Sequence, residues 1–243
     1  MASTRRKLAR RILAATALLL LGPSAWIAWD LANDNLGVVQ PGRVLRAAQM
    51  SSGRLSATLR EHGVRTVLNL RGANPDEAWY RAERDATVAA GATQVDVSMS
   101  SCIWMSRVQL RTLVKALDEM EYPVLIHCAW GSERTGLVSA IAELLREGST
   151  LEDARAQFSV RYLFVPVGDG RIMAEAIDQY EAWLAAEKAT HSPANFRRWA
   201  GSGYRPQKPS REDWPYDPYP LIVVTPPPAE ATAANPETGK ATR

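Results

Sequence analysis

Cysteine and histidine are scarce in this chain of 243 residues, which contains two cysteines and three histidines. Apart from the adjacent pair His127 and Cys128, no two of them stand at a spacing that zinc sites use. Two cysteines cannot build a disulfide framework either. We therefore expect no metal and no other cofactor. Cys102 is expected to be a free packed thiol. The alternative is a disulfide bridge between Cys102 and Cys128 that protects Cys128 from over-oxidation.

A broad excess of positive charge is also missing. The formal net charge is +3, but five Lys and Arg residues stand between positions 5 and 11, before the first acidic residue. The rest of the chain is therefore slightly acidic, and it offers no broad basic face to a nucleic acid. The hydrophobic content of 46% predicts a globular protein, and the length suits one sizeable core with tails.

Charge is absent from Ile12–Trp29. At about 1.5 Å per residue, a helix of this length reaches roughly 27 Å, just enough to cross a bilayer core. Cations precede the stretch and Asp30 and Asp34 follow it, so the positive-inside rule leaves the N-terminus in the cytoplasm. We expect a single-pass anchor with the rest of the chain on the extracytoplasmic (periplasmic) side. The alternative is a cleaved signal peptide whose apolar region ends at Gly22 and Pro23, with the cleavage point near Ala25 or Ala28.

The most informative stretch is Pro123–Gly136. Val124 to Ile126 are apolar and mostly β-branched, which is typical of a strand covered on both faces. A loop with Gly131 follows, and the apolar segment 137–145 predicts a helix that begins near Arg134. The loop thus ends on a helix N-terminus, whose free amides and positive dipole end form an anion site.

Two residues of this loop suit phosphate chemistry. The planar fork of Arg134 can hold two phosphate oxygens. The same positive field lowers the pKa of Cys128, so that a thiolate able to attack phosphorus exists near neutral pH. One arrangement would therefore bind the substrate and activate the nucleophile.

The pattern His-Cys-x5-Arg-Thr-Gly, from His127 to Gly136, resembles the signature loop of the cysteine-dependent protein-tyrosine and dual-specificity phosphatases. Arg46–Gln49 and Thr66–Gly72 resemble the opening of a bacterial branch of this family that is related to the plant and fungal atypical dual-specificity phosphatases. The resemblance implies the compact α/β phosphatase fold over residues 43–188, with a central, mostly parallel sheet flanked by helices. It also implies hydrolysis of a phosphomonoester through a cysteinyl-phosphate.

The resemblance further implies roles for single residues. Cys128 is the nucleophile, Arg134 holds the phosphate, His127 orients Cys128 and lowers its pKa, and Thr135 eases release of the thiolate. Arg71 either approaches the rim of the site or is a surface residue paired with an acidic neighbour. The expected substrate-binding residues of the loop are Ala129, Trp130, Gly131, Ser132 and Arg134.

Two carboxylates compete for the role of general acid. Asp96 lies 32 residues before Cys128, where many relatives carry an aspartate, but it falls within an alternating strand pattern. Glu133 lies inside the signature loop, and a third possibility is that neither acts. This gap leaves a membrane-tethered phosphate-binding module with little turnover as the alternative function. The signature suits phosphorylated proteins, lipids, sugars and inositol phosphates alike.

Patterning predicts the remaining organisation of the chain. Alternating or β-branched runs predict strands near 43–46, 64–70 and 93–99, and amphipathic runs predict helices near 55–62, 76–90, 107–117 and 171–184. The predicted segments are the anchor or signal (1–30), a linker (31–42), the phosphatase domain (43–188), an extended aromatic and proline-rich segment that packs on the domain (189–224) and a disordered tail (225–243).

Overall fold

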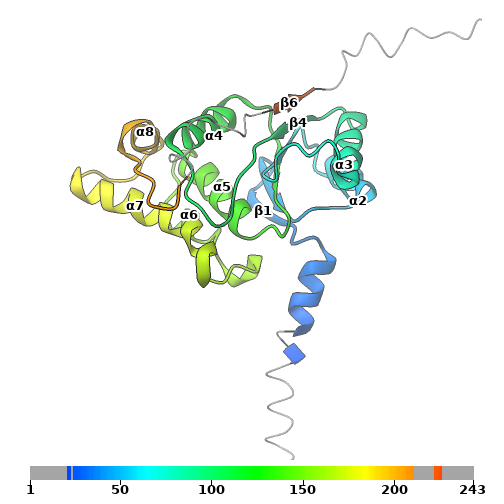
Figure 1. Ribbon diagram of the computed structural model, residues 1–243, viewed down its shortest axis with the longest axis horizontal. Coiled ribbons are helices and arrows are strands. Elements are labelled where there is room, and N and C mark those ends of the chain that lie inside the picture. Colours follow the sequence, from blue (N-terminus) through cyan, green and yellow to red (C-terminus); the bar gives the residue numbers. More distant parts are fainter. Residues whose placement is uncertain (1–20, 23, 211–221, 226–243) are drawn as a thin grey trace, which may run out of the picture.

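The computed structural model describes residues 21–22, 24–210 and 222–225, which form an α/β fold with helices on both faces of one sheet (Figure 1). The six strands are arranged in the order β1-β2-β5-β3-β4-β6. Their bounds are Gly37–Gln40 (β1), Val44–Ala47 (β2), Thr66–Asn69 (β3), Thr93–Asp96 (β4), Val124–His127 (β5) and Ile222–Val224 (β6). The four central strands are parallel and the two edge strands antiparallel, so the sheet is mixed around a parallel centre.

The helices follow the amphipathic patterns of the sequence closely. Ser51 and Ser106 cap α2 and α4 by accepting hydrogen bonds from the amides of Arg54 and Gln109, as serines do at helix starts. The α-helices are Ser52–Glu61 (α2), Ala78–Ala89 (α3), Arg107–Glu119 (α4), Glu133–Leu144 (α5), Leu151–Arg155 (α6), Ile172–Ala186 (α7) and Pro193–Arg198 (α8). Short helical turns span Val160–Tyr162 (η1), Gly168–Arg171 (η2) and Trp199–Gly203 (η3).

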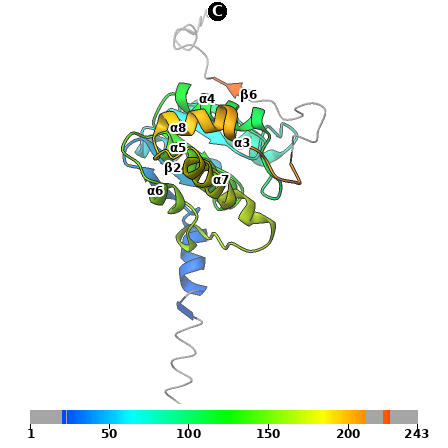
Figure 2. The ribbon, with the colours of Figure 1, turned by 90° about the vertical axis from the view of Figure 1, so that its left-hand side faces the viewer.

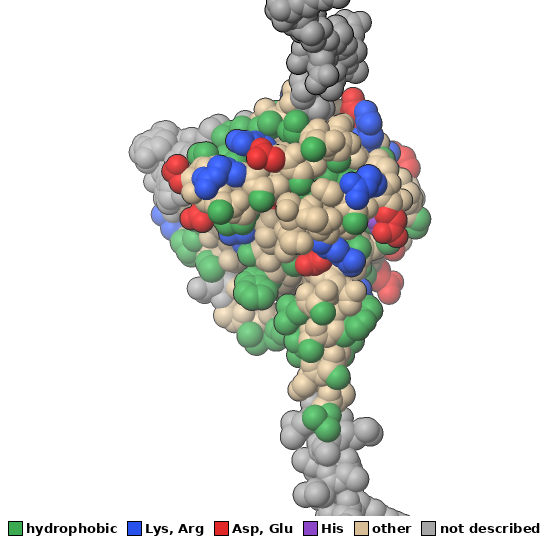
Figure 3. Space-filling model, turned by 90° about the vertical axis from the view of Figure 1, so that its right-hand side faces the viewer, with side chains coloured by type: hydrophobic (Ala, Val, Ile, Leu, Met, Phe, Trp, Pro, Cys, Tyr) green, Lys and Arg blue, Asp and Glu red, His purple; other side chains and the backbone are tan. Residues whose placement is uncertain are grey.

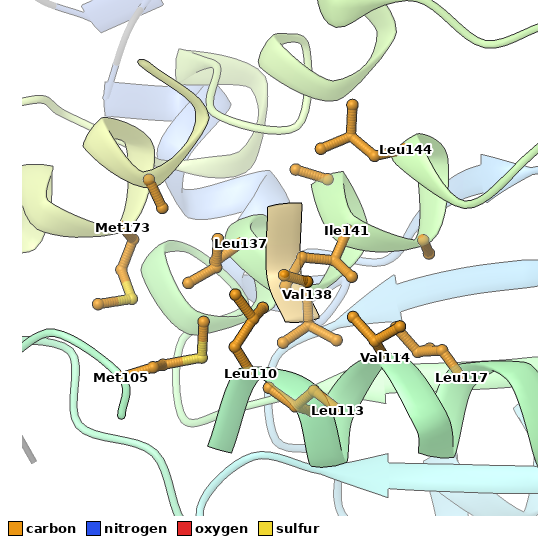
Figure 4. Packing of buried hydrophobic residues seen from close by; sticks show 14 of the residues in the cluster. Met105, Leu110, Leu113, Val114, Leu117, Leu137, Val138, Ile141, Leu144 and Met173 are labelled. Atoms are coloured by element: carbon orange, nitrogen blue, oxygen red, sulfur yellow. The ribbon is translucent and has the colours of Figure 1, made fainter. Parts of the chain in front are cut away.

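The larger core lies between the sheet and the layer formed by α4, α5 and α7 (Figure 4). Helix α5 is its centre, because every residue from Thr135 to Leu144 is buried. A helix that is covered all round has no polar face to indicate its orientation, and its position is fixed by packing on every side. The labelled side chains that meet there are Met105, Leu110, Leu113, Val114, Leu117, Leu137, Val138, Ile141, Leu144 and Met173.

A smaller core covers the other face of the sheet, beneath α2 and α3. Leu55 and Leu59 of α2 pack there with Leu45, Val67 and Leu125 of the sheet. Alternate residues of β2, β3 and β5 thus face opposite helical layers, which is the packing expected of strands buried on both faces. The predicted α/β layer architecture is confirmed.

Residues 31–42, predicted to be a linker, are part of the folded domain. They contain β1, which pairs with β2, and Asn35 and Gln40 are buried. Asp34 and Asn35 adopt left-handed backbone conformations, which these residue types tolerate best after glycine. The turn they form joins β1 to the preceding helix, residues 24–32, hereafter the N-terminal helix, which projects from the body of the domain (Figures 1 and 2).

Residues 189–210, in the segment after α7, pack on the domain and are largely helical, whereas the sequence predicted an extended segment. Helix α8 and turn η3 bring Phe196 and Trp199 against Tyr180 of α7. Tyr204 packs on Trp199, and all three rings belong to the larger core. The sequence shows no period there because the aromatics come from short consecutive turns. Trp214, Tyr216 and the predicted tail beyond Thr225 lie outside the described residues.

No helix in the part of the chain that the structure describes is both long and apolar enough to span a bilayer. Most of the predicted span Ile12–Trp29 falls on residues 12–20 and 23, which lie outside that part.

Candidate active site

The signature loop leaves the centre of the sheet at its carboxyl edge. Strand β5 runs between β2 and β3, and Ala47, His127, Asn69 and Asp96 form one row across the four parallel strands. Cys128 therefore lies one residue beyond the edge, and the chain then turns through residues 129–132 into α5. Crevices outside the carboxyl ends of parallel strands are the usual ligand sites of such sheets.

The loop is held in a conformation that only glycine permits at its middle. Gly131 has a φ of +69°, and a Cβ atom there would lie 2.7 Å from the backbone of Ala47 and Ala48. This close approach tucks the loop against the end of β2. The amides of Gly131, Ser132, Glu133 and Arg134 have no backbone acceptor within the described residues, so they are available to an anion.

Cys128 is almost fully buried beneath this loop and is a free thiol. Burial raises its pKa, but the charge of Arg134, the hydroxyl and amide of Thr135 and the amide of Trp130 lower it by more. The net result is a pKa below the usual value, so a thiolate forms more readily than in water. Cys102 is exposed and also free, so the structure contains no bridge between the two cysteines.

Arg134 lies on the first turn of α5, beside Cys128. Its Nη1 donates to the carbonyl oxygens of Met99, at 3.2 Å, and Leu70, at a long 3.5 Å. Both carbonyls belong to segments that follow central strands, so the guanidinium is positioned across the carboxyl edge. Its buried Nε has no partner among the described residues. A bound phosphate would give the fork the acceptors it lacks.

A second arginine, Arg46, supports the loop from behind and was not assigned a role by the sequence. It is fully buried, and its two terminal nitrogens each donate a 2.7 Å hydrogen bond, one to the carbonyl of Gln157 and one to that of Gly131. Its guanidinium also stacks 3.7 Å from the ring centroid of Tyr162. Burial lowers the pKa of Arg46 to about 10, so it stays charged at neutral pH.

A buried polar chain supports His127 on the other side. Nε2 of His127 lies 3.2 Å from Oε1 of Glu83, an ion pair when the imidazole is protonated. Gln49 donates to the other oxygen of Glu83 and accepts from Arg71, whose guanidinium lies over the ring of Trp79. Arg71 is thus connected to His127 only through the side chains of Gln49 and Glu83, and its guanidinium stacks on Trp79.

The groups of this hydrogen-bonded series shift one another's pKa values. Burial lowers the pKa of His127, but Glu83 and Cys128 raise it by more, so the imidazole is more easily protonated than usual. Burial raises the pKa of Glu83, yet His127, Gln49 and Arg71 together lower it below its usual value. An imidazolium next to Cys128 in turn favours the thiolate. The sequence offers only a weak signal for Glu83, which shares one face of α3 with Tyr80 and Thr87.

The two candidate acids are placed very differently. Asp96 is buried at the end of β4, and its carboxylate accepts hydrogen bonds from Asn69, Gln94 and Tyr80. Burial raises its pKa, and these hydrogen bonds offset that only in part. Since β3 separates β4 from β5, and strands lie about 4.8 Å apart, the backbone of Asp96 is roughly 10 Å from that of His127.

Glu133 begins α5, directly before Arg134, and is half-buried. Its side chain lies under the loop that precedes α7, because a Cβ atom on Gly170 would come within 3.1 Å of its Cγ. Its carboxylate has no hydrogen-bond or ion-pair partner within residues 24–210.

The other predicted loop residues surround these groups. The ring of Trp130 is 65% exposed at the surface, whereas Ala129 is half-buried and Ser132 and Thr135 are buried. The carbonyl of Trp130 accepts a hydrogen bond from the side chain of Asn35, which joins the loop to the start of the domain. No cluster of three metal-ligating side chains occurs in the described ranges.

Residues 30–150 match the sequence model of a family described as the tyrosine phosphatase family. None of the curated proteins matches the chain. Among solved structures, the chain is similar to the catalytic core of the PP-IP phosphatase Siw14 from S. cerevisiae (20% identity over 63% of this chain and 92% of that one, TM-score 0.46). It is also similar to TpbA from P. aeruginosa (19%, 69% and 96%, 0.43) and to a PTP-like phytase from Bdellovibrio bacteriovorus (14%, 69% and 84%, 0.47).

Proposed function

The chain belongs to the tyrosine phosphatase family, a group of cysteine-dependent phosphatases, and from this premise we propose that it hydrolyses phosphomonoesters through a phosphate ester of Cys128. One observation supports the proposal above all others. A buried cysteine with a lowered pKa lies beneath a loop of free amides, beside an arginine whose Nε lacks a partner in the described part of the chain. This arrangement combines an activated nucleophile with an anion site.

The reaction takes place in two displacements. The thiolate of Cys128 attacks phosphorus in line, so that an S–P bond forms as the P–O bond to the leaving group breaks. The leaving oxygen takes a proton from a general acid. Water then attacks the cysteinyl-phosphate, the S–P bond breaks, and inorganic phosphate leaves while the proton of water passes to the carboxylate of the former acid. The hydroxyl of Thr135 faces Cys128 and stabilises the departing thiolate.

The transition state places negative charge on the equatorial oxygens of the phosphoryl group. The loop amides and the fork of Arg134 meet this charge from fixed positions, which is the form of stabilisation that costs no reorganisation during the reaction. Arg46 contributes indirectly, because it holds the carbonyl of Gly131 and so sets the direction of the neighbouring amides. Glu83 raises the pKa of His127, and when the imidazole is protonated its charge favours the neighbouring thiolate.

We assign the general acid to Glu133. It is in the loop, and its carboxylate is unpaired within the described ranges, whereas the carboxylate of Asp96 accepts from three donors and lies two strands away. On a poor leaving group such as an alkyl phosphate, Glu133→Gln should remove the basic limb of the pH–rate profile, and Asp96→Asn should keep it. Loss of that limb in Asp96→Asn alone would transfer the role to Asp96, and its retention in both variants would reject both residues.

The alternative left open by the sequence is a phosphate-binding module with little turnover. Release of p-nitrophenol from p-nitrophenyl phosphate separates the two, because this leaving group hardly needs an acid. Cys128→Ser should abolish release, Arg134→Lys should reduce it by about 10²–10³, as removal of an oxyanion contact does, and Cys102→Ser should leave it unchanged. A rate that is the same in Cys128→Ser and the unaltered chain would exclude the covalent mechanism.

We also propose that residues 12–29 anchor the chain in a membrane and that the domain lies on the extracytoplasmic side. The lack of charge in this stretch and the cations before it support the proposal. Fusion of alkaline phosphatase, which is active only outside the cytoplasm, to Arg243 should give an active reporter. If the alkaline phosphatase fusion is inactive and a fusion of a fluorescent protein that folds only in the cytoplasm is fluorescent, the C-terminus lies in the cytoplasm and the proposed orientation is wrong.

A further inference from the structure

We propose that the mouth of the active site faces the membrane surface and that the substrate is the phosphomonoester headgroup of a lipid in that surface. The inference rests on the proposed phosphatase function and on the proposed anchor. It adds where the site is held relative to the bilayer, and which class of substrate this position selects.

The N-terminal helix emerges from the same edge of the sheet as the signature loop. Asn35, three residues after the helix ends, donates from its side-chain amide to the carbonyls of Trp130 and Tyr162, at 3.0 and 3.1 Å. The amide of Ala48, just past the end of β2, donates to the carbonyl of Asp34. The helix therefore leaves the domain beside the catalytic loop and not from the opposite edge of the sheet.

No flexible spacer separates this helix from the domain. Asp30 is buried and ion-paired with Arg161 of η1, which also donates to the carbonyl of Leu36. These contacts attach the last turn of the helix to the folded body. The helix axis and the catalytic loop are thus held in one geometry, so the distance of the active site from a membrane that contains the preceding residues is limited to a short range.

Exposed apolar side chains gather around this exit. Most of the large hydrophobic side chains that the described residues expose belong to the N-terminal helix, to the signature loop or to the segment 160–167 before α7. They are Ile27, Trp29, Leu31, Trp130, Val160, Val165 and Val167. In Figure 3, hydrophobic side chains cover the lower end of the domain and the helix beneath it, and the charged side chains lie higher. A gathering of exposed apolar side chains at one end of a domain is a candidate interaction surface.

The segment 160–167 is next to both the helix and the active site. Arg161 pairs with Asp30 of the helix, and Gly170, which follows the segment, lies against Glu133 at the start of α5. In Figure 1 this part of the chain lies beside the upper end of the helix. The chain that carries Val165 and Val167 therefore runs from a contact with the N-terminal helix to a contact with the start of α5.

A bilayer fits this surface better than a protein does. The N-terminal helix is exposed around most of its circumference before Asp30, whereas a helix that packs on its own domain would bury one stripe. It continues the uncharged stretch that begins at Ile12, and it carries Trp26 and Trp29, the residue type enriched where helices cross the membrane–water interface. The headgroup layer is about 5–8 Å deep on each side of the hydrocarbon core.

An active site that is held at the level of the headgroup layer lies closer to the phosphates of lipids than to any other phosphate. A phosphomonoester on a lipid can enter the loop without leaving the bilayer, and the exposed ring of Trp130 would lie among the headgroups. A folded phosphoprotein would have to insert between the domain and the membrane to reach Cys128. The geometry therefore selects lipid phosphomonoesters over phosphoproteins.

The test uses the full chain reconstituted in phosphatidylcholine vesicles. Three substrates are compared by kcat/KM: dioleoyl phosphatidate in the vesicles, soluble glycerol 3-phosphate, which carries the same headgroup without the chains, and a soluble phosphotyrosine peptide. p-Nitrophenyl phosphate serves as the measure of the chemistry itself. We expect phosphatidate to exceed glycerol 3-phosphate by at least about tenfold and to exceed the peptide.

A pair of matched double variants tests the surface. Val165→Ser with Val167→Ser should reduce hydrolysis of phosphatidate by about tenfold and leave p-nitrophenyl phosphate unchanged. Val108→Ser with Val223→Ser, two valines of similar exposure elsewhere on the domain, should change neither. A preference for the peptide, equal rates on phosphatidate and glycerol 3-phosphate, or equal effects of the two variants would overturn the inference. Failure on p-nitrophenyl phosphate would instead refute the proposed phosphatase function.

Discussion

Replacement of Arg46 by lysine should weaken both the fold and the catalytic loop. The change keeps the positive charge, so the cost of burying a cation remains, but it removes the planar fork. A single ammonium cannot occupy both nitrogen positions that now reach the carbonyls of Gly131 and Gln157, each at 2.7 Å. One charged hydrogen bond is lost, at about 1.5–3 kcal/mol. Loss of the stack on Tyr162 adds about 0.5–2 kcal/mol.

The expected decrease in the free energy of unfolding is therefore about 2–5 kcal/mol, measured by urea denaturation with an unchanged m-value. Arg65→Lys is the matched control, because Arg65 is exposed and makes only a surface pair with Glu121, and it should cost less than about 0.5 kcal/mol. At a temperature where both proteins are fully folded, Arg46→Lys should also lower kcat/KM on p-nitrophenyl phosphate by at least about tenfold. A loss of stability below about 0.5 kcal/mol, with full activity, would refute the reasoning.

Two further substitutions test the supports of the loop. Glu83→Gln removes the carboxylate that pairs with His127. Because folding raises the pKa of His127, the pair stabilises the folded protein fully below the usual imidazole pKa of 6.5. This contribution is lost as the pH rises through the pKa of His127 in the folded protein. The substitution should therefore cost about 1–3 kcal/mol at pH 6 and less at pH 9, and equal losses at the two pH values would contradict the pairing. Gly131→Ala places a Cβ atom 2.7 Å from backbone and should reduce kcat/KM at least about a hundredfold, because the loop must move. Gly148→Ala, at a similar positive φ but in open space, should cost only about 1–2 kcal/mol of backbone strain and leave activity intact.

The signature loop could be predicted because its parts are contiguous in the sequence. A buried strand, a loop with glycine and a helix start were all readable between Pro123 and Gly136, and the fold places them as expected. The parallel centre of the sheet was predictable for the same reason, since each of its four strands is followed by its own helix. Elements that follow one another in the sequence are also neighbours in the fold.

The supports of the loop could not be predicted because they come from distant segments. Arg46 belongs to β2 and its partners to residues 131 and 157, so no spacing in the sequence relates them. Glu83 was visible only as a polar residue on the buried face of α3, and what it faces depends on how that helix crosses β5. Burial of a charged group signals a partner, but the fold alone supplies its identity.

The start of the domain was misplaced by the sequence for a related reason. β1 has four residues, stands at an edge and is followed by Pro41 and Gly42, so its composition resembles a linker. Burial nevertheless begins at Asp30, and the family match begins at the same residue.

This boundary changes what the N-terminal segment can do. From Asp30 a continuous path of contacts runs through Arg161, whose side chain lies near the ring of Tyr162, to Arg46 and the carbonyl of Gly131. Asn35 makes a second, shorter path to the carbonyl of Trp130. A linker would have let the catalytic domain rotate freely relative to the N-terminal helix. Because these contacts join the N-terminal helix to the catalytic loop, a change in the orientation of the helix must either break them or move the loop with it.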